Sequence, residues 1–500
     1  MELLQNLALG FTVAMTPANL LFAFAGALIG TLIGVLPGIG PIATIAMLLP
    51  VTFHLEPVSG LIMLAGIFYG AQYGGSITAI LVNLPGETSS VVTCIDGHQM
   101  ARQGRAGAAL AVAALGSFFA GCVSTALIAT FAPPLAKVGQ SFGAPEYFSL
   151  MVLGLIAAVV LAHGSVLKAV AMIILGLLVG LVGTDGNSGG TRFTFGITTL
   201  ADGLDVATLA IGLFGVGEII ANLAQPEEKR DVLAKVTRLW PSAEDFRQSW
   251  PAVLRGTGLG SVLGVLPGGG ATLSSFAAYA LEKKVARDPS RFGHGAVEGV
   301  AGPESANNAG AQTSFIPMLT LGIPGNAVMA LMIGALTIHG IQPGPQIMTE
   351  RPQMFWGMIA SMWIGNLMLL IINLPLIGIW VQLLRIPYRF LYLAILFFCA
   401  IGVYTVNNSA AAVLLAALFG VLGYIFMRLD CEPAPMILGF VLGPLMEDNL
   451  RRAMRISAGD PMIFLNRPIS LGLLLAALVL LAMVMMPNFR RGREKAFQEP

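Results

Sequence analysis

Charge is what this sequence has least of. Its 500 residues include 27 Lys or Arg and 26 Asp or Glu, together 11% of the chain, whereas a soluble domain usually carries about 25%. Hydrophobic residues make up 56%, and a soluble protein this apolar would expose large adhesive patches. The natural solvent is therefore a lipid bilayer. The formal net charge of +1 gives no reason to propose nucleic acid as a partner.

The sequence also lacks the motifs of common enzymes and metal sites. The four cysteines, at positions 94, 122, 399 and 431, are far apart and form no CxxC pair, so we interpret them as packing residues. There is no GxxxxGK[ST], HExxH or GxSxG string, and the five histidines are scattered. We predict that the chain is not an enzyme, holds no cofactor, and binds no metal beyond a possible Na⁺.

The N-terminal region has no Lys or Arg before Arg102. A cleaved signal peptide carries a basic segment before a short apolar run, and here the first apolar run is long and has no such segment. We therefore expect residues 17–36 to form a retained membrane helix.

Long apolar runs follow throughout the chain, and a membrane helix needs about 20 apolar residues. We expect long membrane helices near 17–36, 57–73, 106–132, 147–163, 166–183, 205–222, 354–381, 387–405, 409–427 and 468–487. Shorter pieces interrupted by Pro and Gly lie near 41–53, 75–85, 252–266, 269–281, 312–323, 326–339 and 434–446. The fold class predicted is an all-α polytopic membrane protein with about twelve membrane elements, the short pieces being broken helices or re-entrant hairpins.

The two halves of the sequence resemble each other. GTLIGVLPGIG at 30–40 matches GSVLGVLPGGG at 260–270, and GAQYGGSITAILVNLPGE at 70–87 is echoed by GAQTSFIPMLTLGIPGN at 310–326. Matched interruptions in a duplicated chain are typical of transporters, although Gly-rich membrane helices can also match by chance. We predict a membrane repeat over 1–222, a polar cytoplasmic connector over 223–250, a second membrane repeat over 251–487 and a basic cytoplasmic tail over 488–500.

The positions of the basic residues indicate how these segments are oriented. The connector and the tail hold most of the clustered Lys and Arg, which the positive-inside rule places in the cytoplasm. The N-terminus is then expected outside, so the first repeat enters the membrane from outside and the second from inside. This arrangement is an inverted repeat.

Each half carries two Pro-Gly breaks with polar residues around them. Broken backbone inside a membrane is tolerated where it is buried in protein or lines a wet cavity, and its free N–H and C=O groups can bind anions and Na⁺. The alternatives are satisfied structural kinks and ordinary hydrogen bonds between helices. The candidate substrate-binding residues are Pro37, Gly38, Ser76, Thr78, Asn83, Pro85, Gly86, Pro267, Gly268, Ser274, Ser275, Asn307, Asn308, Pro324 and Gly325.

Glu304 is the strongest candidate for ion coupling, together with Asn307, because membrane acids are costly and usually functional. No Lys or Arg lies between Phe292 and Glu350. An anionic substrate would therefore be held by dipoles, amides, hydroxyls and bound cations. This favours symport with Na⁺ or H⁺ over a bare anion pore, which commonly uses rings of Arg or Lys.

Longer strings resemble the large permease subunit of the tripartite tricarboxylate transporters. They are GVLPGIGPIATIAMLLP (34–50), YGGSITAILVNLPGE (73–87) and DGHQMARQGRAGAAL (96–110) in the first half, and GVLPGGGATLSSFAAYALEKK (264–284), GAVEGVAGPESANNAG (295–310) and LTLGIPGNAVMALMIGALTIHGIQPGP (319–345) in the second. PESANN followed by LGIPGN is far more specific than glycine content. Beyond about residue 350 the resemblance is carried by order and hydropathy only.

The resemblance implies a multi-pass subunit of the bacterial inner membrane that works with a small membrane subunit and a periplasmic solute-binding protein. Transport would run on a Na⁺ or H⁺ gradient and bring in citrate-like tricarboxylates or related carboxylates. Gly302 and the run Gln312–Phe315 depart from the pattern expected in the family, which affects substrate identity more than membership. The alternatives are a passive anion channel, a non-transporting membrane receptor or scaffold, and an intramembrane enzyme.

Overall fold

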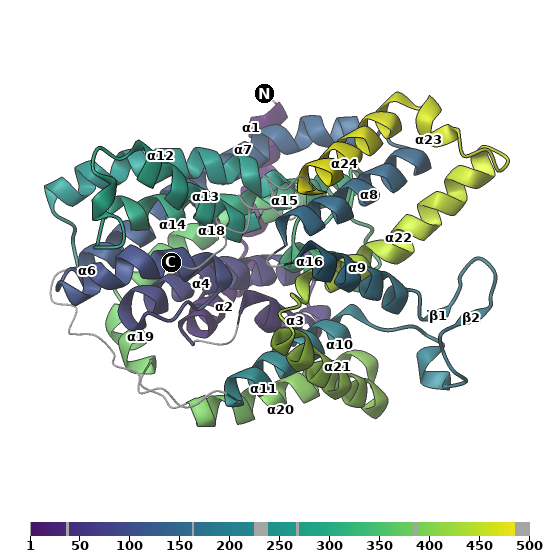
Figure 1. The fold of residues 1–500 in the computed structure, drawn as a ribbon, viewed down its shortest axis with the longest axis horizontal. Helices are drawn as coiled ribbons and strands as arrows, with labels where there is room; N and C mark the ends of the chain where they lie inside the picture. Colours follow the sequence, from purple (N-terminus) through teal and green to yellow (C-terminus); the bar gives the residue numbers. More distant parts are fainter. Residues whose placement is uncertain are drawn as a thin grey trace.

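The computed structural model describes residues 2–36, 40–162, 165–224, 239–266, 270–384 and 388–485, and these residues are almost entirely helical (Figure 1). The strands in this part of the chain are β1 (Gly183–Thr184) and β2 (Thr191–Arg192), a short antiparallel hairpin. Among the described residues, five helices are long and apolar enough to cross a membrane: Pro17–Val35, Ala106–Gly139, Val206–Leu223, Pro352–Asn373 and Ala410–Arg428. The prediction of an all-α polytopic membrane fold is confirmed, while the number of about twelve membrane elements stays a prediction.

The helices of the first half begin with a segment that the hydropathy pattern did not predict, α1 (Glu2–Ala14), which packs on α18. The others are α2 (Pro17–Val35), α3 (Pro41–Phe53), α4 (Pro57–Val82), η1 (Thr88–Ser90), α5 (Val91–Thr93), the π-helical η2 (Cys94–His98), α6 (Gln99–Arg102), α7 (Ala106–Gly139), α8 (Ala144–Leu161), α9 (Val166–Gly180), η3 (Thr198–Leu200), α10 (Val206–Ala210), the π-helical η4 (Ile211–Val216) and α11 (Gly217–Leu223).

The second half begins with α12, which starts at Ala243 and therefore includes the last residues assigned by sequence to the polar connector. Its elements are α12 (Ala243–Val265), α13 (Gly270–Val285), η5 (Pro289–Arg291), α14 (Glu298–Thr313), α15 (Phe315–Leu321), α16 (Ala327–Ile338), α17 (Gln346–Glu350), α18 (Pro352–Asn373), α19 (Ile377–Leu383), α20 (Tyr388–Asn407), α21 (Ala410–Arg428), α22 (Ala434–Ile456), α23 (Ile463–Asn466) and α24 (Pro468–Met485). Residues 225–238 of the connector and the tail 488–500 lie outside the described residues.

Glycines allow two pairs of helices to approach backbone to backbone. Gly26, Gly30 and Gly34 place α2 against the carbonyls of α4, and α12 packs on α14 in the same way. A Cβ at Gly260 would lie 2.2 Å from the backbone oxygen of Ala306. Small residues at such seams are how membrane helices gain van der Waals contact, because lipid gives no hydrophobic driving force between them.

The packing of α12 on α14 predicts a large difference between two substitutions in the same helix. We expect Gly260→Ala to lower the thermal unfolding temperature in detergent, since overpacking against fixed backbone typically costs about 1–3 kcal/mol or more. Gly258 has nothing within 4 Å of its would-be Cβ, so Gly258→Ala is the matched control and should leave the unfolding temperature unchanged or slightly raised. Equal destabilisation by both would contradict this packing.

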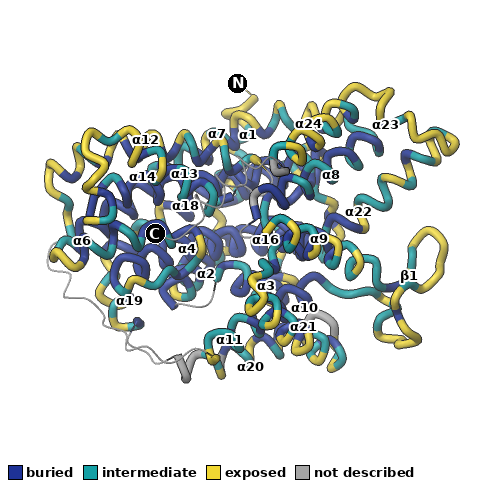
Figure 2. The backbone as a smooth tube through the Cα atoms, viewed as in Figure 1, coloured by how far each residue is buried: buried dark blue, intermediate teal, exposed yellow. Residues whose placement is uncertain are grey.

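The helices α4 and α14 are buried along almost their whole lengths (Figure 2). Helix α4 runs antiparallel to α14 and the start of α15: Ser76 contacts Glu304 of α14, whereas Tyr69, two turns earlier on α4, packs against Phe315, the first residue of α15, with ring centroids 5.9 Å apart. Segments from the two halves of the sequence therefore share one core.

Two groups of ion pairs lie on elements at opposite ends of the long axis, beside α6 at one end and on the β1–β2 hairpin at the other (Figure 1). At one end, Arg105 pairs with Asp245 near the start of α12, and Gln103 donates to the carbonyl of His294. These contacts join the loop after α6, the first turn of α12 and the segment before α14.

At the other end, Arg192 of the hairpin and Arg451 of α22 both pair with Asp185 and Glu447. Hydrogen bonds from Ser188 and the backbone of Asn187, together with Arg192, hold the pKa of Asp185 well below its usual range. Glu447 and Arg451 lie on α22, which continues ten residues beyond the expected apolar piece, from 446 to 456.

Candidate functional site

Glu304 lies at the centre of the contact between the two halves. It is 1% exposed, and its carboxylate accepts hydrogen bonds from Ser76 of α4 at 2.6 Å, from Thr93 of α5, and from the Asn307 amide at 3.4 Å. Ser76 and Thr93 belong to the first half and Glu304 to the second, so this acid ties the halves together. Within the described residues, no Lys or Arg is buried and none pairs with Glu304.

A second set of polar groups surrounds the helix backbone beside Glu304. Asn308 donates to Ser117 of α7 at 2.8 Å, to the carbonyl of Glu304 at 3.0 Å and to the Asn307 side chain at 2.6 Å. Ser117 also donates to the Glu304 carbonyl at 3.3 Å. Glu304, Asn307 and Asn308 therefore form one connected cluster, and its hydrogen bonds join α14 to α7.

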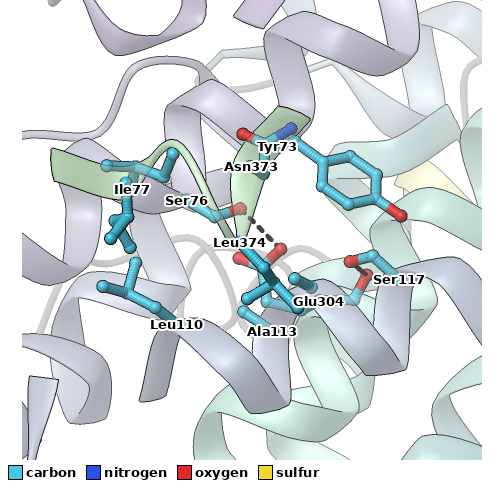
Figure 3. Close-up of a pocket in the computed structure, with 11 residues that line it drawn as sticks. Tyr73, Ser76, Ile77, Leu110, Ala113, Ser117, Glu304, Asn373 and Leu374 are labelled. Carbon is cyan, nitrogen blue, oxygen red and sulfur yellow. Dashed lines mark hydrogen bonds between the residues drawn. The ribbon is translucent and has the colours of Figure 1, made fainter. Parts of the chain in front are cut away.

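A small cavity of about 20 Å³ opens beside the Glu304 carboxylate (Figure 3). Its lining residues come from α4, α7, α14 and the end of α18, and they include Tyr73, Ser76, Ser117, Glu304 and Asn373. The Tyr73 hydroxyl and the Asn373 carbonyl oxygen are buried without a hydrogen-bond partner in the described structure. A cavity of this size holds about one water molecule or an ion of similar size, and is far too small for a tricarboxylate.

The described Pro-Gly corners have a common backbone form. The helix before Pro85 ends with Asn83 at φ 58°, and the helix before Pro324 ends with Gly322 at φ 71°, both left-handed. Left-handed residues commonly end helices, because they turn the chain and expose the last carbonyls to new partners. The new helical segments are then capped by Glu87, through the backbone of Ser90, and by Asn326, through the backbone of Met329.

Several predicted site residues make their contacts within or beside these Pro-Gly corners and do not line the cavity. Thr78 donates to carbonyls of its own helix and to Gly34 of α2 at 3.2 Å, and Gly86 packs directly on the Gly34 carbonyl. Ser274 donates to the Gly270 carbonyl within α13. Gly325 lies 3.9 Å from the Gly264 carbonyl, as measured from its would-be Cβ.

Ser275 is the exception among these predicted residues, because its hydroxyl is buried and has no hydrogen-bond partner in the described structure. Asn83 is exposed at its corner. Pro37, Gly38, Pro267 and Gly268 lie outside the described residues; the flanking helices end at Val35 and Val265 and resume at Pro41 and Gly270.

Sequence reasoning left out four side chains that the structure brings to Glu304 or its cavity: Tyr73, Thr93, Ser117 and Asn373. Tyr73 and Thr93 were visible as polar residues beside the first-half break. Ser117 and Asn373 gave only the weak signal of a single polar residue in a long apolar run, which helix-to-helix hydrogen bonding explains equally well.

The arrangement offers several oxygen atoms around one buried acid. Carboxylate, hydroxyl and amide oxygens are the ligands that hard cations prefer. A carboxyl group in a dry site without a basic partner is stable when it carries a proton or when a cation neutralises it. The cluster can therefore hold a proton or a small cation between the two halves.

Comparison with known proteins shows that the chain matches a protein family. Residues 20–438 match the Tripartite tricarboxylate transporter TctA family, and every predicted site residue lies in that range. The chain belongs to the TctA family. TctA is the large subunit of the tripartite tricarboxylate transporter, so this is a family of multi-pass transport proteins and not of enzymes. The resemblance seen in the PESANN and LGIPGN strings is confirmed.

Two relatives of this TctA-family chain come from Agrobacterium vitis. One, described as "Uncharacterized 52.8 kDa protein in TAR-I ttuC' 3'region", is 59% identical over 499 residues, which covers 100% of this chain and 99% of the relative. The other, "Uncharacterized protein in TAR-II ttuC' 3'region", is 58% identical over 240 residues, 48% of this chain and 99% of the relative. No solved structure matches the chain.

Proposed function

We propose that this TctA-family chain is the large subunit of a secondary transporter that takes up small organic carboxylates, citrate-like tricarboxylates among them, in symport with Na⁺ or H⁺. It would work in the bacterial inner membrane with a small membrane subunit and a periplasmic solute-binding protein, as the family does. The observation that carries the proposal is Glu304: a fully buried acid, bridged by first-half hydroxyls and without a basic partner in the described structure.

Ion coupling follows from the position of Glu304. An ion or proton that binds this acid changes the charge at the contact between α4 and α14, which holds the two halves together through Ser76 and Thr93. Loading and release of the ion would therefore alter how readily the halves move relative to each other. A ligand can shift an equilibrium between two conformations only if it binds them with different affinity. An ion at Glu304 would do so, because its site is complete only while the two halves are in contact.

We also propose that the halves are inverted repeats. Support comes from the matched glycine seams of α2 on α4 and α12 on α14, from the matched left-handed corners, and from the antiparallel course of α4 and α14. The end of the molecule at the start of α12, which follows the basic connector in sequence, would be cytoplasmic by the positive-inside rule, and the β1–β2 hairpin would then lie on the periplasmic side. The cavity beside Glu304 is too small for substrate, so this conformation would be a closed state of an alternating-access cycle.

The experiment is uptake of labelled citrate into proteoliposomes that hold this chain and its small membrane subunit, with the periplasmic binding protein outside. A Na⁺ gradient, a proton gradient and no gradient are imposed in turn, and terephthalate replaces citrate in a parallel series. We expect uptake in one of the gradient conditions and only when the binding protein is present. Uptake that proceeds equally without any gradient would contradict symport and favour the passive channel.

A further inference from the structure

The contact between α4 and α14 carries an unusual set of buried polar side chains. Residues 69, 72, 73 and 76 follow helical spacing along one face of α4, and residues 304, 308 and 312 do the same on α14, with Phe315 following at the start of α15. The Ser76–Glu304 hydrogen bond marks one end of this seam and the Tyr69–Phe315 ring contact the other. Gln72 and Gln312 therefore lie on facing stripes between those two contacts.

The polar groups along this seam have almost no protein partners. Within the described structure, neither the nitrogen nor the oxygen of the Gln72 amide has a hydrogen-bond partner, and the Gln312 nitrogen has none. The hydroxyls of Tyr69 and Tyr73 are also buried and unpaired. The Gln312 oxygen has one contact, with Thr125 of α7 at 3.5 Å, the limit of a hydrogen bond.

Buried polar groups in native proteins are nearly always hydrogen-bonded, and leaving one unpaired is unfavourable. Four such side chains on one seam, with Gln72 0% and Gln312 1% exposed, therefore point to a partner that is not part of this chain. By contrast, Asn308 lies one turn from Gln312 on the same helix and makes three hydrogen bonds. The lack of hydrogen-bond partners is therefore specific to the side chains of this seam, since a neighbouring buried amide on the same helix is hydrogen-bonded.

The chemistry of the seam favours an anion. Two amide N–H₂ groups and two tyrosine hydroxyls offer donors. The unpaired carbonyl oxygen among these side chains is that of Gln72, and the hydroxyls can act as donors or acceptors, so donors outnumber obligate acceptors. Neutral donors of this kind bind carboxylate oxygens. Because the described residues include no buried Lys or Arg, they would do so without a fixed positive charge.

We propose that Gln72 and Gln312 are paired recognition residues for a substrate carboxylate, one from each half, reached when α4 and α14 move apart. The proposal rests on the transport function proposed above and adds its anion subsite. The two glutamines occupy matching positions in the similar strings GAQYGG and GAQTSF, so each half supplies one amide to the same ligand. Glu304, farther along the seam, holds the coupling ion or proton.

The test uses Gln72→Met, Gln312→Met and the double variant in the complete transporter, because Met has a similar volume and no amide. Citrate is the probe, in two measurements: the concentration dependence of uptake, and the shift in unfolding temperature on adding citrate. Loss of one hydrogen bond to a charged ligand should weaken apparent citrate affinity about tenfold, and the double variant about a hundredfold. Without citrate, the unfolding temperature of each variant should equal or exceed that of the wild type, because an unpaired amide has been removed.

Asn308→Leu is the contrasting variant, since its amide is fully paired, and it should unfold at a lower temperature without citrate. The inference is wrong if the double Met variant keeps wild-type citrate affinity, or if it is destabilised as Asn308→Leu is. In either case the glutamines are structural, and the proposed transport function is unaffected. If the wild type itself neither takes up citrate nor is stabilised by it, the proposed citrate transport fails and the inference fails with it.

Discussion

Glu304→Gln should reduce gradient-driven uptake to the level of liposomes without the protein. The amide has nearly the shape of the carboxyl group. Its oxygen can still accept from one of the Ser76 and Thr93 hydroxyls and its N–H₂ can donate to the other, so membrane insertion and folding should be retained. An amide, however, neither releases a proton in this pH range nor neutralises a cation. The variant therefore keeps the contact between the halves and loses the group that couples transport to the ion. Uptake and unfolding temperature, measured on the same preparation, separate these two effects.

Glu298→Gln is the matched control for that variant. Glu298 lies on the same helix but pairs with Arg291 at the molecular surface, where the side chains are 15% and 41% exposed. Such pairs typically contribute about 0.2–1 kcal/mol, so uptake should stay near the wild-type level. Normal uptake by Glu304→Gln, or equal loss in both variants, would contradict the coupling role of Glu304.

Asp96→Ala should produce the largest loss of stability among single substitutions outside the cavity. The Asp96 carboxylate is fully buried in η2 and accepts from the backbone N–H groups of Gly293, Gly295 and Ala296 at 2.8–2.9 Å, and from Tyr279 at 2.9 Å. The substitution leaves three buried backbone donors unpaired, at about 1–3 kcal/mol each. We expect a loss of at least about 3 kcal/mol, measured as a lower unfolding temperature in detergent.

Tyr279→Phe provides a graded comparison, because it removes one of the four donors to Asp96 and keeps the aromatic ring. We expect a loss of about 1 kcal/mol. An Asp96→Ala protein as stable as Tyr279→Phe would show that the three backbone hydrogen bonds contribute little. Asp96 therefore accepts from the backbone of a segment about 200 residues away, in the other half of the chain.

Apolar runs of helix length predicted most of the fold because a membrane helix satisfies its own backbone, so length and hydropathy are nearly sufficient. Helix α2 begins at Pro17, as expected, and α21 spans residues 410–428, close to the predicted 409–427. Hydropathy did not predict helices whose extent depends on tertiary packing or on ion pairs. Helix α1 was missed because its stability comes from packing on α18, and α22 extends past its apolar part through the ion pairs Arg451–Glu447 and Arg452–Asp448.

The sequence was sufficient to predict the central residue of the candidate site, Glu304, but not its partners from the first half. Glu304 and its neighbours Asn307 and Asn308 were visible because an acid and two amides are rare in an apolar context. Their partners were not, since Ser76 and Thr93 lie more than 200 residues away and nothing local indicates which polar residues of the first half would meet them. The unpaired state of Gln72 and Gln312 is likewise a property of the tertiary packing.

The most direct test of the central claim is whether the reconstituted transporter accumulates a carboxylate above its external concentration. Proteoliposomes with the small subunit and the binding protein receive labelled citrate at equal concentrations inside and outside, and a Na⁺ or proton gradient is then imposed. The account predicts net inward movement that stops and reverses when an ionophore collapses the gradient. Citrate that stays at equal concentrations under both gradients, although it exchanges freely across the membrane, would contradict ion-coupled transport and identify a passive pathway.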